Sequence, residues 1–445
     1  MGVQIKVGSS IVPVTSVQVK LGGVYQAVTN AFVKSGGAYV SALTPPPIQS
    51  VVTQNRTMSS AETRTGKTRV FFRWPIVFAC DVTSVIYSFN NWYSSNAGEV
   101  AVANGYSIEA CSLEIGSEVT PITFSGGRTK ALLSGESDIQ SDEVAIAVSK
   151  GTAGWVKGIV SVPVSGNLIP FCARVTTDVA GSQAAWYDPA VTTPSSVDVP
   201  GEFTVTGTAA ETRVTTVCPI VLGRPTASTI SFIAVGDSIG EGAGDSSAAG
   251  IHGKGFVQRA MHAAGSDTQD LYPCMNFCRT GNDTPDSIGA NTRWREFIQY
   301  ATHAIEEYGT NDLGSSGTGD VTTIQNNIST LWGILRTGGI QKIIRSELMP
   351  RTSSASTNWI SEADQTVNTN WGAGEKSEQM NAWFASQIGS GVDYVVTSSL
   401  VRDPTVPQKW ITNGTNDYPT ADGTHPAPAT SEFAAVALRS VIASL

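Results

Sequence analysis

The chain has 445 residues, more than the roughly 250 to 300 at which a single core usually stops growing, so two or three domains are expected. Apolar residues make up 41% and charged residues 15% of the chain, which excludes a disordered protein and favours a β-rich globular one. The net charge of -9 comes without a basic cluster, so nucleic acid is not expected as a partner.

The sequence indicates neither a membrane segment nor a secretory signal. No run approaches the roughly 18 apolar residues of a spanning helix, and the start, MGVQIKVGSS, lacks a signal peptide's apolar core and cleavage site. We therefore expect no membrane insertion and no unaided export. The six cysteines are too sparse for a disulfide scaffold and have no histidine at zinc-binding spacing, so most are expected to be buried thiols, although Cys274 and Cys278 are close enough in sequence to pair.

The first 45 residues contain a repeat of 14 residues: VQIKVGSSIVPV, VQVKLGGVYQAV and AFVKSGGAYVSA superpose with Lys6, Lys20 and Lys34 in register. Each unit predicts a hairpin that leaves an apolar face uncovered, which favours docking on a partner or on other copies. The repeat resembles the short Lys-x-Gly-Gly β-repeats of phage tail and virion proteins. A plain β-meander leading into the next domain fits the pattern as well. The predicted turns are at Gly8, Gly22 and Gly36.

A proline-rich linker, TPPPIQS, precedes a long region of short strand-like runs. The runs alternate with clusters of Gly, Pro, Asn and Ser and predict an all-β domain over residues 46–225, a sandwich of the jelly-roll kind. Exposed aromatic residues of such sandwiches often bind glycans, and here they either do so or belong to the core. The runs include TRVFFRWPIVFA, VTSVIYSF, YSIEACSLEI, EVAIAVSK, WVKGIVSVPV and TRVTTVCPIVLG, and the aromatic candidates are Trp92, Tyr93, Trp155 and Trp186.

Residues 226–445 change to strands that alternate with helices. SFIAV, HAIEEYG, QKIIRSELMP and VDYVVTSS predict strands, whereas GFVQRAMHAAG, TRWREFIQYA, VTTIQNNISTLWGILRTGG, KSEQMNAWFASQIG and SEFAAVALRSVIASL predict helices. This alternation indicates βαβ units around a parallel sheet, so we expect an α/β domain with its chemistry at the carboxyl ends of the strands.

Three short strings lie after strands or before the last helix of this α/β region: GDS at Ser238, GTND at Asn311 and DGTHP at His425. Each has a structural reading, since Ser238 and Asn311 fit helix caps and an acid near a histidine is common on surfaces. Only one of the four histidines, His425, has an acid three residues earlier, and that acid is Asp422. Asp312 is expected to serve structurally.

The order Gly-Asp-Ser, Gly-x-Asn-Asp and Asp-x-x-His resembles the SGNH or GDSL family of serine hydrolases, which are esterases on a flavodoxin-like sheet. The resemblance covers residues 226–445 alone. It implies that Ser238 is the nucleophile and that Asp422 and His425 complete the triad. The chemistry agrees, because a serine hydroxyl needs a base and the imidazole needs a carboxylate at its far nitrogen. Gly423 permits a tight loop and Pro426 favours an extended backbone at the preceding histidine.

The family also has an oxyanion hole, in which the resemblance places Asn311. Its remaining glycine fits best to Gly281 in CRTGND, although Gly289 lies in the same interval. The backbone N–H groups of Ser238 and Gly281 and the Asn311 amide then supply three donors, and loss of one such donor typically costs about 2.7 to 4 kcal/mol of barrier.

The loop after Ser238, IGEGAGDSSAAG, is small and polar, and no long apolar lid follows it. A lipase for long acyl chains needs a more apolar mouth, so acetyl groups on a polar carrier are expected. Trp359, Trp371 and Trp410 either stack on the sugar rings of such a carrier or pack over the sheet edge.

These observations favour a carbohydrate O-acetylesterase that needs no cofactor and no metal. The N-terminal repeat indicates a phage virion component, a tail fibre or tailspike that deacetylates host surface polysaccharide. Its first 45 residues then bind other virion proteins, and a homotrimer is expected by analogy with such fibres. Three alternatives stay open: a non-catalytic receptor-binding or structural virion protein, an exported bacterial carbohydrate esterase acting outside the cell or at its surface, and a lipase or phospholipase.

Overall fold

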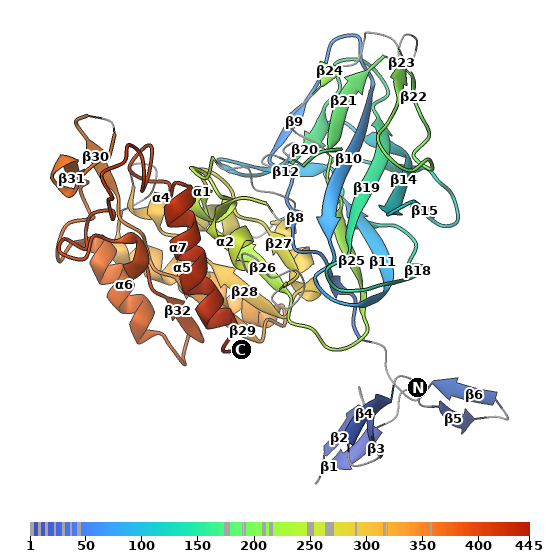
Figure 1. Ribbon diagram of the computed structural model, residues 1–445, viewed down its shortest axis with the longest axis horizontal. Helices are drawn as coiled ribbons and strands as arrows, with labels where there is room; N and C mark the ends of the chain where they lie inside the picture. The colour runs from blue at the N-terminus through green and yellow to red at the C-terminus, as the bar shows by residue number, and fades with distance from the viewer. Residues whose placement is uncertain are drawn as a thin grey trace.

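The computed structural model describes residues 4–7, 10–13, 17–21, 24–28, 32–35, 38–41, 46–172, 179–188, 190, 193–206, 211–212, 217–246, 253–262, 271–289, 292–314, 317, 319–356 and 358–445 (Figure 1). Its N-terminal repeat forms three separate two-stranded antiparallel sheets. Lys6 lies opposite Ile11, Lys20 opposite Tyr25 and Lys34 opposite Tyr39, so the predicted hairpin repeat is confirmed in register. The turn glycines lie outside the described residues. The strands are β1 (Gln4–Val7), β2 (Ser10–Pro13), β3 (Val17–Leu21), β4 (Val24–Val28), β5 (Phe32–Ser35) and β6 (Ala38–Ser41).

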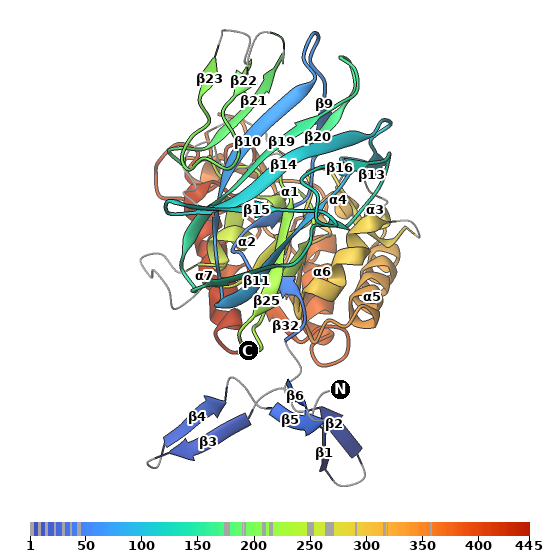
Figure 2. The ribbon, with the colours of Figure 1, turned by 90° about the vertical axis from the view of Figure 1, so that its right-hand side faces the viewer.

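Two antiparallel sheets form the all-β part. The seven-stranded sheet has the order β15-β14-β19-β10-β21-β24, with β16 beside β14, and the five-stranded sheet has the order β17-β11-β25-β7, with β18 beside β11 (Figure 2). Their strands are β7 (Gln49–Ser50), β10 (Arg69–Val77), β11 (Val82–Phe89), β14 (Tyr106–Ile115), β15 (Glu118–Ile122), β16 (Lys130–Leu132), β17 (Ile139–Gln140), β18 (Val144–Val148), β19 (Ala153–Ser161), β21 (Gln183–Tyr187), β24 (Glu211–Thr212) and β25 (Ile220–Pro225).

The five-stranded sheet separates two hydrophobic cores. Val85 and Tyr87 of β11 pack with Phe72 of β10 in one core, whereas Ile86 of β11 packs with Ile233 in the other. Successive side chains of a strand point to opposite faces, so one face of this sheet covers the larger sheet and the other covers the α/β part. The predicted sandwich therefore shares its smaller sheet with the α/β part, an arrangement that the sequence does not predict.

A parallel sheet of the order β32-β29-β28-β26-β27-β8 forms the α/β part. The five strands from residue 232 onward follow the flavodoxin-like order 2-1-3-4-5, which confirms the predicted parallel sheet. Two strands were not predicted, because runs of two or three residues show no periodicity. One of them, β8, lies in the predicted β domain yet pairs with β27. The strands are β8 (Asn55–Arg56), β26 (Phe232–Val235), β27 (Cys274–Asn276), β28 (His303–Glu306), β29 (Lys342–Ser346) and β32 (Tyr394–Val396).

Helices cover both faces of the parallel sheet. Leu331 and Phe384, from two helices, pack on one face, whereas Val257 and Leu438 pack on the other. No helix in the described part of the chain is long and apolar enough to cross a membrane. The predicted helix TRWREFIQYA is a 3-10 helix, η2. The helices are α1 (Ser238–Glu241), α2 (Gly255–Ala260), α3 (Thr284–Ile288), η2 (Arg293–Tyr300), α4 (Thr310–Leu313), α5 (Val321–Thr337), η3 (Glu362–Asp364), α6 (Lys376–Ser386), η4 (Ser399–Val401) and α7 (Pro428–Ile442).

Short two-stranded ribbons complete the architecture, and one of them, β12–β13, reaches the candidate site described below. The ribbon strands are β9 (Ser60–Glu62), β12 (Trp92–Ser95), β13 (Gly98–Ala101), β20 (Ile169–Phe171), β22 (Thr193–Pro194), β23 (Val205–Thr206), β30 (Thr352–Ser354) and β31 (Gln365–Val367).

All six cysteines are buried free thiols, as predicted, and Cys274 and Cys278 do not pair. The thiols are Cys80, Cys111, Cys172, Cys218, Cys274 and Cys278. Burial raises the pKa of the Cys80 and Cys274 thiols to about 12, so neither is a thiolate at neutral pH.

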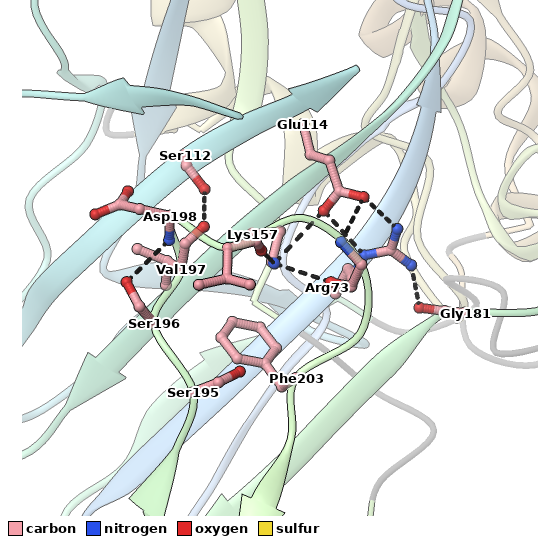
Figure 3. A network of polar contacts seen from close by, with 12 residues as sticks. Arg73, Ser112, Glu114, Lys157, Gly181, Ser195, Ser196, Val197, Asp198 and Phe203 are labelled. Atoms are coloured by element: carbon pink, nitrogen blue, oxygen red, sulfur yellow. Dashed lines mark hydrogen bonds and ion pairs between the residues drawn. The ribbon is translucent and has the colours of Figure 1, made fainter. Parts of the chain in front are cut away.

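A buried ion network lies on the outer face of the seven-stranded sheet (Figure 3). Glu114 accepts from Arg73 Nη2 at 2.7 Å and lies 3.5 Å from Lys157 Nζ. A loop closes the network, because Lys157 donates to Gly201 O at 2.9 Å and Gly201 N donates to Glu114 Oε1 at 3.1 Å. The three charged side chains are at most 7% exposed. They join three strands and the loop, and their partners offset the cost of burying charge.

The aromatic candidates of the sandwich divide into buried and partly exposed residues. Trp92 and Trp186 are buried in hydrophobic cores, so neither offers a face to a glycan. Tyr93 is partly buried against the sandwich core, and the Trp155 ring lies 3.6 Å beneath the Arg73 guanidinium. The core reading is therefore the right one for Trp92 and Trp186.

Candidate active site

Ser238 is the first residue of helix α1, directly after β26. The side chain of Asp237, not that of Ser238, caps this helix by accepting from Ile239 N at 2.9 Å. The capping reading of Ser238 is therefore wrong. The serine is 4% exposed, and its hydroxyl is available for a different contact.

That contact is with His425. The imidazole Nε2 lies 2.7 Å from Ser238 Oγ, and Nδ1 lies 2.6 Å from Asp422 Oδ2. The other carboxylate oxygen, Oδ1, accepts the backbone N–H groups of Thr424 and His425 at 2.9 Å each. The loop thus holds its own carboxylate against the ring, and the fold brings the predicted triad residues together.

The charge of Asp422 sets the tautomer of the ring. Burial raises the pKa of this carboxyl, but hydrogen bonds from the His425 ring and backbone outweigh burial and hold the pKa well below its usual range. An ionised carboxylate beside Nδ1 keeps the proton there and leaves the Nε2 lone pair facing Ser238. The histidine is thereby set up as a base toward the serine hydroxyl.

Gly423 is required by the shape of this loop. Its φ is +80°, and a Cβ there would lie 1.7 Å from Thr352 O. Gly423 O accepts from Thr352 N at 2.9 Å and from Trp410 Nε1 at 3.0 Å. The predicted role of this glycine in the bend is confirmed, because no side chain fits at the position.

Two of the predicted oxyanion donors, the backbone N–H groups of Ser238 and Gly281, have no acceptor among the described residues. Gly281 has φ +87°, and a Cβ there would meet Asn96 Cβ at 2.7 Å. The neighbouring Asn282 O accepts from Asn311 Nδ2 at 2.8 Å, which joins the Gly281 turn to the predicted oxyanion amide. By contrast, Gly289 ends helix α3 with an ordinary φ of -52°.

Asn311 does not cap its helix, because Gly309 occupies the N-cap of α4. The neighbouring Asp312 serves structurally as predicted, since its Oδ1 accepts from Thr284 N at 3.0 Å. We expect Asn311→Ala to lower kcat for an ester by about 10²- to 10³-fold with little change in KM, because the amide acts on the transition state. Steady-state kinetics on p-nitrophenyl acetate measure both constants. A variant that loses thermal stability at full kcat would contradict this role.

Glu241, from the same short helix as Ser238, holds the Gly281 turn in place. Its Oε2 accepts from Thr280 N at 2.6 Å and from the Thr280 hydroxyl, and Oε1 lies 3.1 Å from Arg279 Nη1. The side chain is 5% exposed. Glu241 is not among the residues predicted from the sequence. The one signal for it there is an acid within one helical turn of Ser238, in a run of small residues.

We expect Glu241→Gln to lower kcat by about 10²-fold, because the uncharged amide loosens the turn that presents the Gly281 N–H. KM should change much less, since substrate binding does not use this carboxylate. The matched control is Asp198→Asn, which breaks an exposed ion pair with Arg128 in the all-β part and should leave kcat unchanged. If both variants behave alike in steady-state assays, Glu241 is not a positioning residue.

The all-β part also reaches this turn through the β12–β13 hairpin. Ser94 O accepts from Arg279 Nε at 2.9 Å, Ser94 Oγ accepts from Asn282 Nδ2 at 3.3 Å, and the exposed Asn96 lies against Gly281. The turn that carries a predicted oxyanion donor is therefore held from two sides, by Glu241 and by a hairpin far away in the sequence.

A buried ion pair supports the strand end that leads to Asn311. Glu306 Oε1 accepts from Arg345 Nη1 and from Tyr308 N at 2.8 Å each, and both charged side chains are fully buried. Burial raises the pKa of the Glu306 carboxyl, and the positive charge of Arg345 opposes that shift. The pair fixes the backbone immediately before Gly309.

The prediction that three tryptophans bind sugar rings is wrong. Trp359, Trp371 and Trp410 are 5%, 3% and 0% exposed, so no ring face is open to a ligand. Each indole N–H is satisfied inside the protein, by Thr352 Oγ1, Met349 O and Gly423 O respectively. The alternative reading, packing, is correct. Trp359 and Trp410 contact the β30 strand and the triad loop respectively, and Trp371 belongs to a hydrophobic core of the α/β part.

No protein-family model and no curated protein matches the sequence. Solved structures that are similar to this chain include a GDSL-like lipase from Bacteroides thetaiotaomicron, at 15% identity and TM-score 0.33, covering 48% of this chain and 88% of that one. A carbohydrate acetylesterase from Sinorhizobium meliloti has 18% identity and TM-score 0.32, covering 48% and 99%. The protein YXIM of Bacillus subtilis has 9% identity and TM-score 0.35, covering 83% and 80%.

Proposed function

We propose that this chain is a serine esterase that removes acetyl groups from a carbohydrate. One observation carries the proposal: an unbroken chain of contacts from Ser238 Oγ to His425 Nε2 at 2.7 Å and from His425 Nδ1 to Asp422 Oδ2 at 2.6 Å. The proposal assigns the backbone N–H groups of Ser238 and Gly281, which have no acceptor among the described residues, as donors to the oxyanion.

In this proposal His425 Nε2 takes the proton of Ser238 as Oγ attacks the ester carbonyl carbon. The carbonyl oxygen becomes an oxyanion that accepts from the backbone N–H groups of Ser238 and Gly281 and from the Asn311 amide. As the C–O bond of the ester breaks, His425 gives its proton to the leaving alcohol. Water then enters, loses a proton to His425 and attacks the acyl carbon. As the bond between that carbon and Ser238 Oγ breaks, His425 returns the proton to Oγ, which regenerates the serine hydroxyl, and acetic acid leaves.

The narrow surroundings of Ser238 support a short acyl group. Glycines follow the nucleophile closely, and a Cβ at Gly244 would meet His425 Cβ at 2.7 Å. At Gly242 a Cβ would meet Lys254 O at 2.8 Å. This close packing favours acetyl over a long chain, which needs a larger apolar surface.

The test uses the full chain. A fluorophosphonate probe should label Ser238 alone, as peptide mass spectrometry shows, and p-nitrophenyl acetate should react faster than the butyrate and palmitate esters. Acetylated polysaccharide should release acetate while its chain length is unchanged. A preference for palmitate would support a lipase instead, and a chain that is neither labelled nor active would be a non-catalytic protein.

We also propose the setting, a fibre or tailspike of a phage virion that acts on host surface polysaccharide. The support is the hairpin repeat of residues 1–45, which is expected to bind other virion proteins, and a homotrimer follows only by analogy. Tail or capsid genes beside the coding gene would agree with this setting, whereas polysaccharide-utilisation genes would favour an exported bacterial enzyme.

A further inference from the structure

An open pocket of about 560 Å³ lies beside helix α4. Three segments line it, and none of the lining residues is acidic. Its volume falls within the range of about 300 to 1,000 Å³ that is usual for small-molecule sites. The lining residues are Leu313, Gly314, Arg351, Val367, Asn368, Thr369, Asn370 and Trp371.

The cation of this pocket is Arg351, which forms no ion pair with any acidic residue that the structure describes. Its Nε is buried without a hydrogen bond, and no described residue accepts from its guanidinium. The guanidinium instead lies over the ring of Trp371, with Cζ 5.3 Å from the ring centroid. Other enclosed arginines have acceptors inside the protein: Arg73 pairs with Glu114 and Arg345 with Glu306, and Arg56 donates to the backbone carbonyls of Glu241 and Lys254. Arg351 has neither kind of acceptor among the described residues. An arginine held by an aromatic face and left without an acid is arranged for an external anion.

The pocket is joined to both sides of the candidate active site. Arg351 Nη1 lies against Gly314, 2.5 Å from where a Cβ there would stand, and this glycine closes the helix that carries Asn311. The next residue along the chain, Thr352, donates to Gly423 O at 2.9 Å, within the loop that holds Asp422 and His425. A ligand in the pocket is therefore bound by the same loops that hold the triad and the oxyanion amide.

We propose that this pocket binds the carboxylate of an acidic sugar, so that the substrate is an acetylated acidic polysaccharide; the proposal rests on the esterase function proposed above. The planar guanidinium of Arg351 donates two parallel hydrogen bonds to a carboxylate. Asn368, Thr369 and Asn370 supply amide and hydroxyl groups for sugar hydroxyls. In a chain of net charge -9, an acidic polymer needs such a local cation for recognition.

The test compares an O-acetylated oligogalacturonide with an O-acetylated oligogalactoside of the same length, which lacks the carboxylates. The unaltered chain should have a kcat/KM about 10-fold higher on the acidic substrate. Arg351→Gln should raise KM on that substrate by about 10- to 100-fold with kcat unchanged, and Arg351→Lys should restore part of the loss. Activity on the neutral substrate reports folding, and Arg128→Gln is the matched control for losing an arginine.

Equal KM values of Arg351→Gln and the unaltered chain on the acidic substrate would overturn the pocket proposal. If both proteins still hydrolyse p-nitrophenyl acetate in that case, the pocket proposal fails but the proposed esterase function stands. If p-nitrophenyl acetate is not hydrolysed at all, the esterase function fails. Calorimetric binding of the non-acetylated oligogalacturonide to the unaltered chain and to Arg351→Gln then decides the pocket separately, with equal affinities again counting against it.

Discussion

Replacing Ser238 with alanine is expected to lower kcat for p-nitrophenyl acetate by about a million-fold, since a serine hydrolase loses its covalent route without the nucleophile. His425→Ala should cost a similar factor, because the serine hydroxyl lies 2.7 Å from its ring, the one base that contacts it among the described residues. The double variant Ser238→Ala/His425→Ala should be no worse than either single variant, because the two residues act as one unit.

Long end-point assays and steady-state assays on highly purified protein measure these losses in kcat. His303→Gln is the matched control. His303 stands at the amino end of β28, away from the carboxyl ends where the triad lies, and its Nδ1 contacts Thr302 Oγ1 at 2.8 Å. The control should keep kcat per folded molecule. Additive losses in the double variant, or an active Ser238→Ala, would rule out the triad.

Glu114→Gln is expected to lower the free energy of unfolding at pH 7 by about 3 to 5 kcal/mol, because it leaves two buried cations without their counter-charge. The two cations are Arg73 and Lys157, and the carboxylate that pairs with them is 3% exposed. Urea unfolding monitored by tryptophan fluorescence measures the loss. Asp198→Asn breaks an exposed pair with Arg128 and should cost at most about 1 kcal/mol.

The loss of unfolding free energy in Glu114→Gln should be largest near neutral pH and smaller in acid. Burial raises the pKa of Glu114, but hydrogen bonds from Arg73 and Gly201 N and the charges of Arg73 and Lys157 outweigh it, so the pKa is lowered. The stabilisation is therefore complete above the unfolded pKa of about 4.3 and fades as the pH falls through the lower folded pKa. Protonated glutamic acid resembles glutamine, so the gap between the variant and the unaltered chain should shrink below about pH 4. A gap that stays constant down to acid unfolding would contradict an ionic role.

The elements that are long or local in the chain could be predicted from the sequence. Helices α5, α6 and α7 have apolar residues at helical spacing. The strand at Phe232–Val235 is a continuous apolar run and the strand at Lys342–Ser346 contains the apolar pair Ile343 and Ile344, so the alternation of strands and helices indicates a parallel sheet. The contact between Asp422 and His425 is also local, because three residues in a glycine-containing loop suffice to bring a carboxylate to Nδ1.

Other features could not be predicted from the sequence, because they depend on contacts between segments that are far apart in the chain. The Trp359, Trp371 and Trp410 rings could equally have faced solvent, and contacts with segments outside their own loops buried them. The close approach of Asn96 to Gly281, which has no counterpart at Gly289, likewise depends on a distant hairpin. Local sequence determines short-range geometry and periodicity, whereas burial and partner choice depend on which surfaces meet after the chain has folded.

The same reason explains the residues that were missed. Glu241 holds the Thr280 backbone, and Asn96 lies on a hairpin of the all-β part that reaches Gly281. Arg351 stands out because no acid among the described residues pairs with it. None of these three carries a motif of its own. The sequence by itself determined an α/β half and its candidate nucleophile, base and acid, since these follow from periodicity and short spacings. The supports of the candidate site and the pocket beside helix α4 were decided by long-range packing, which no local pattern encodes.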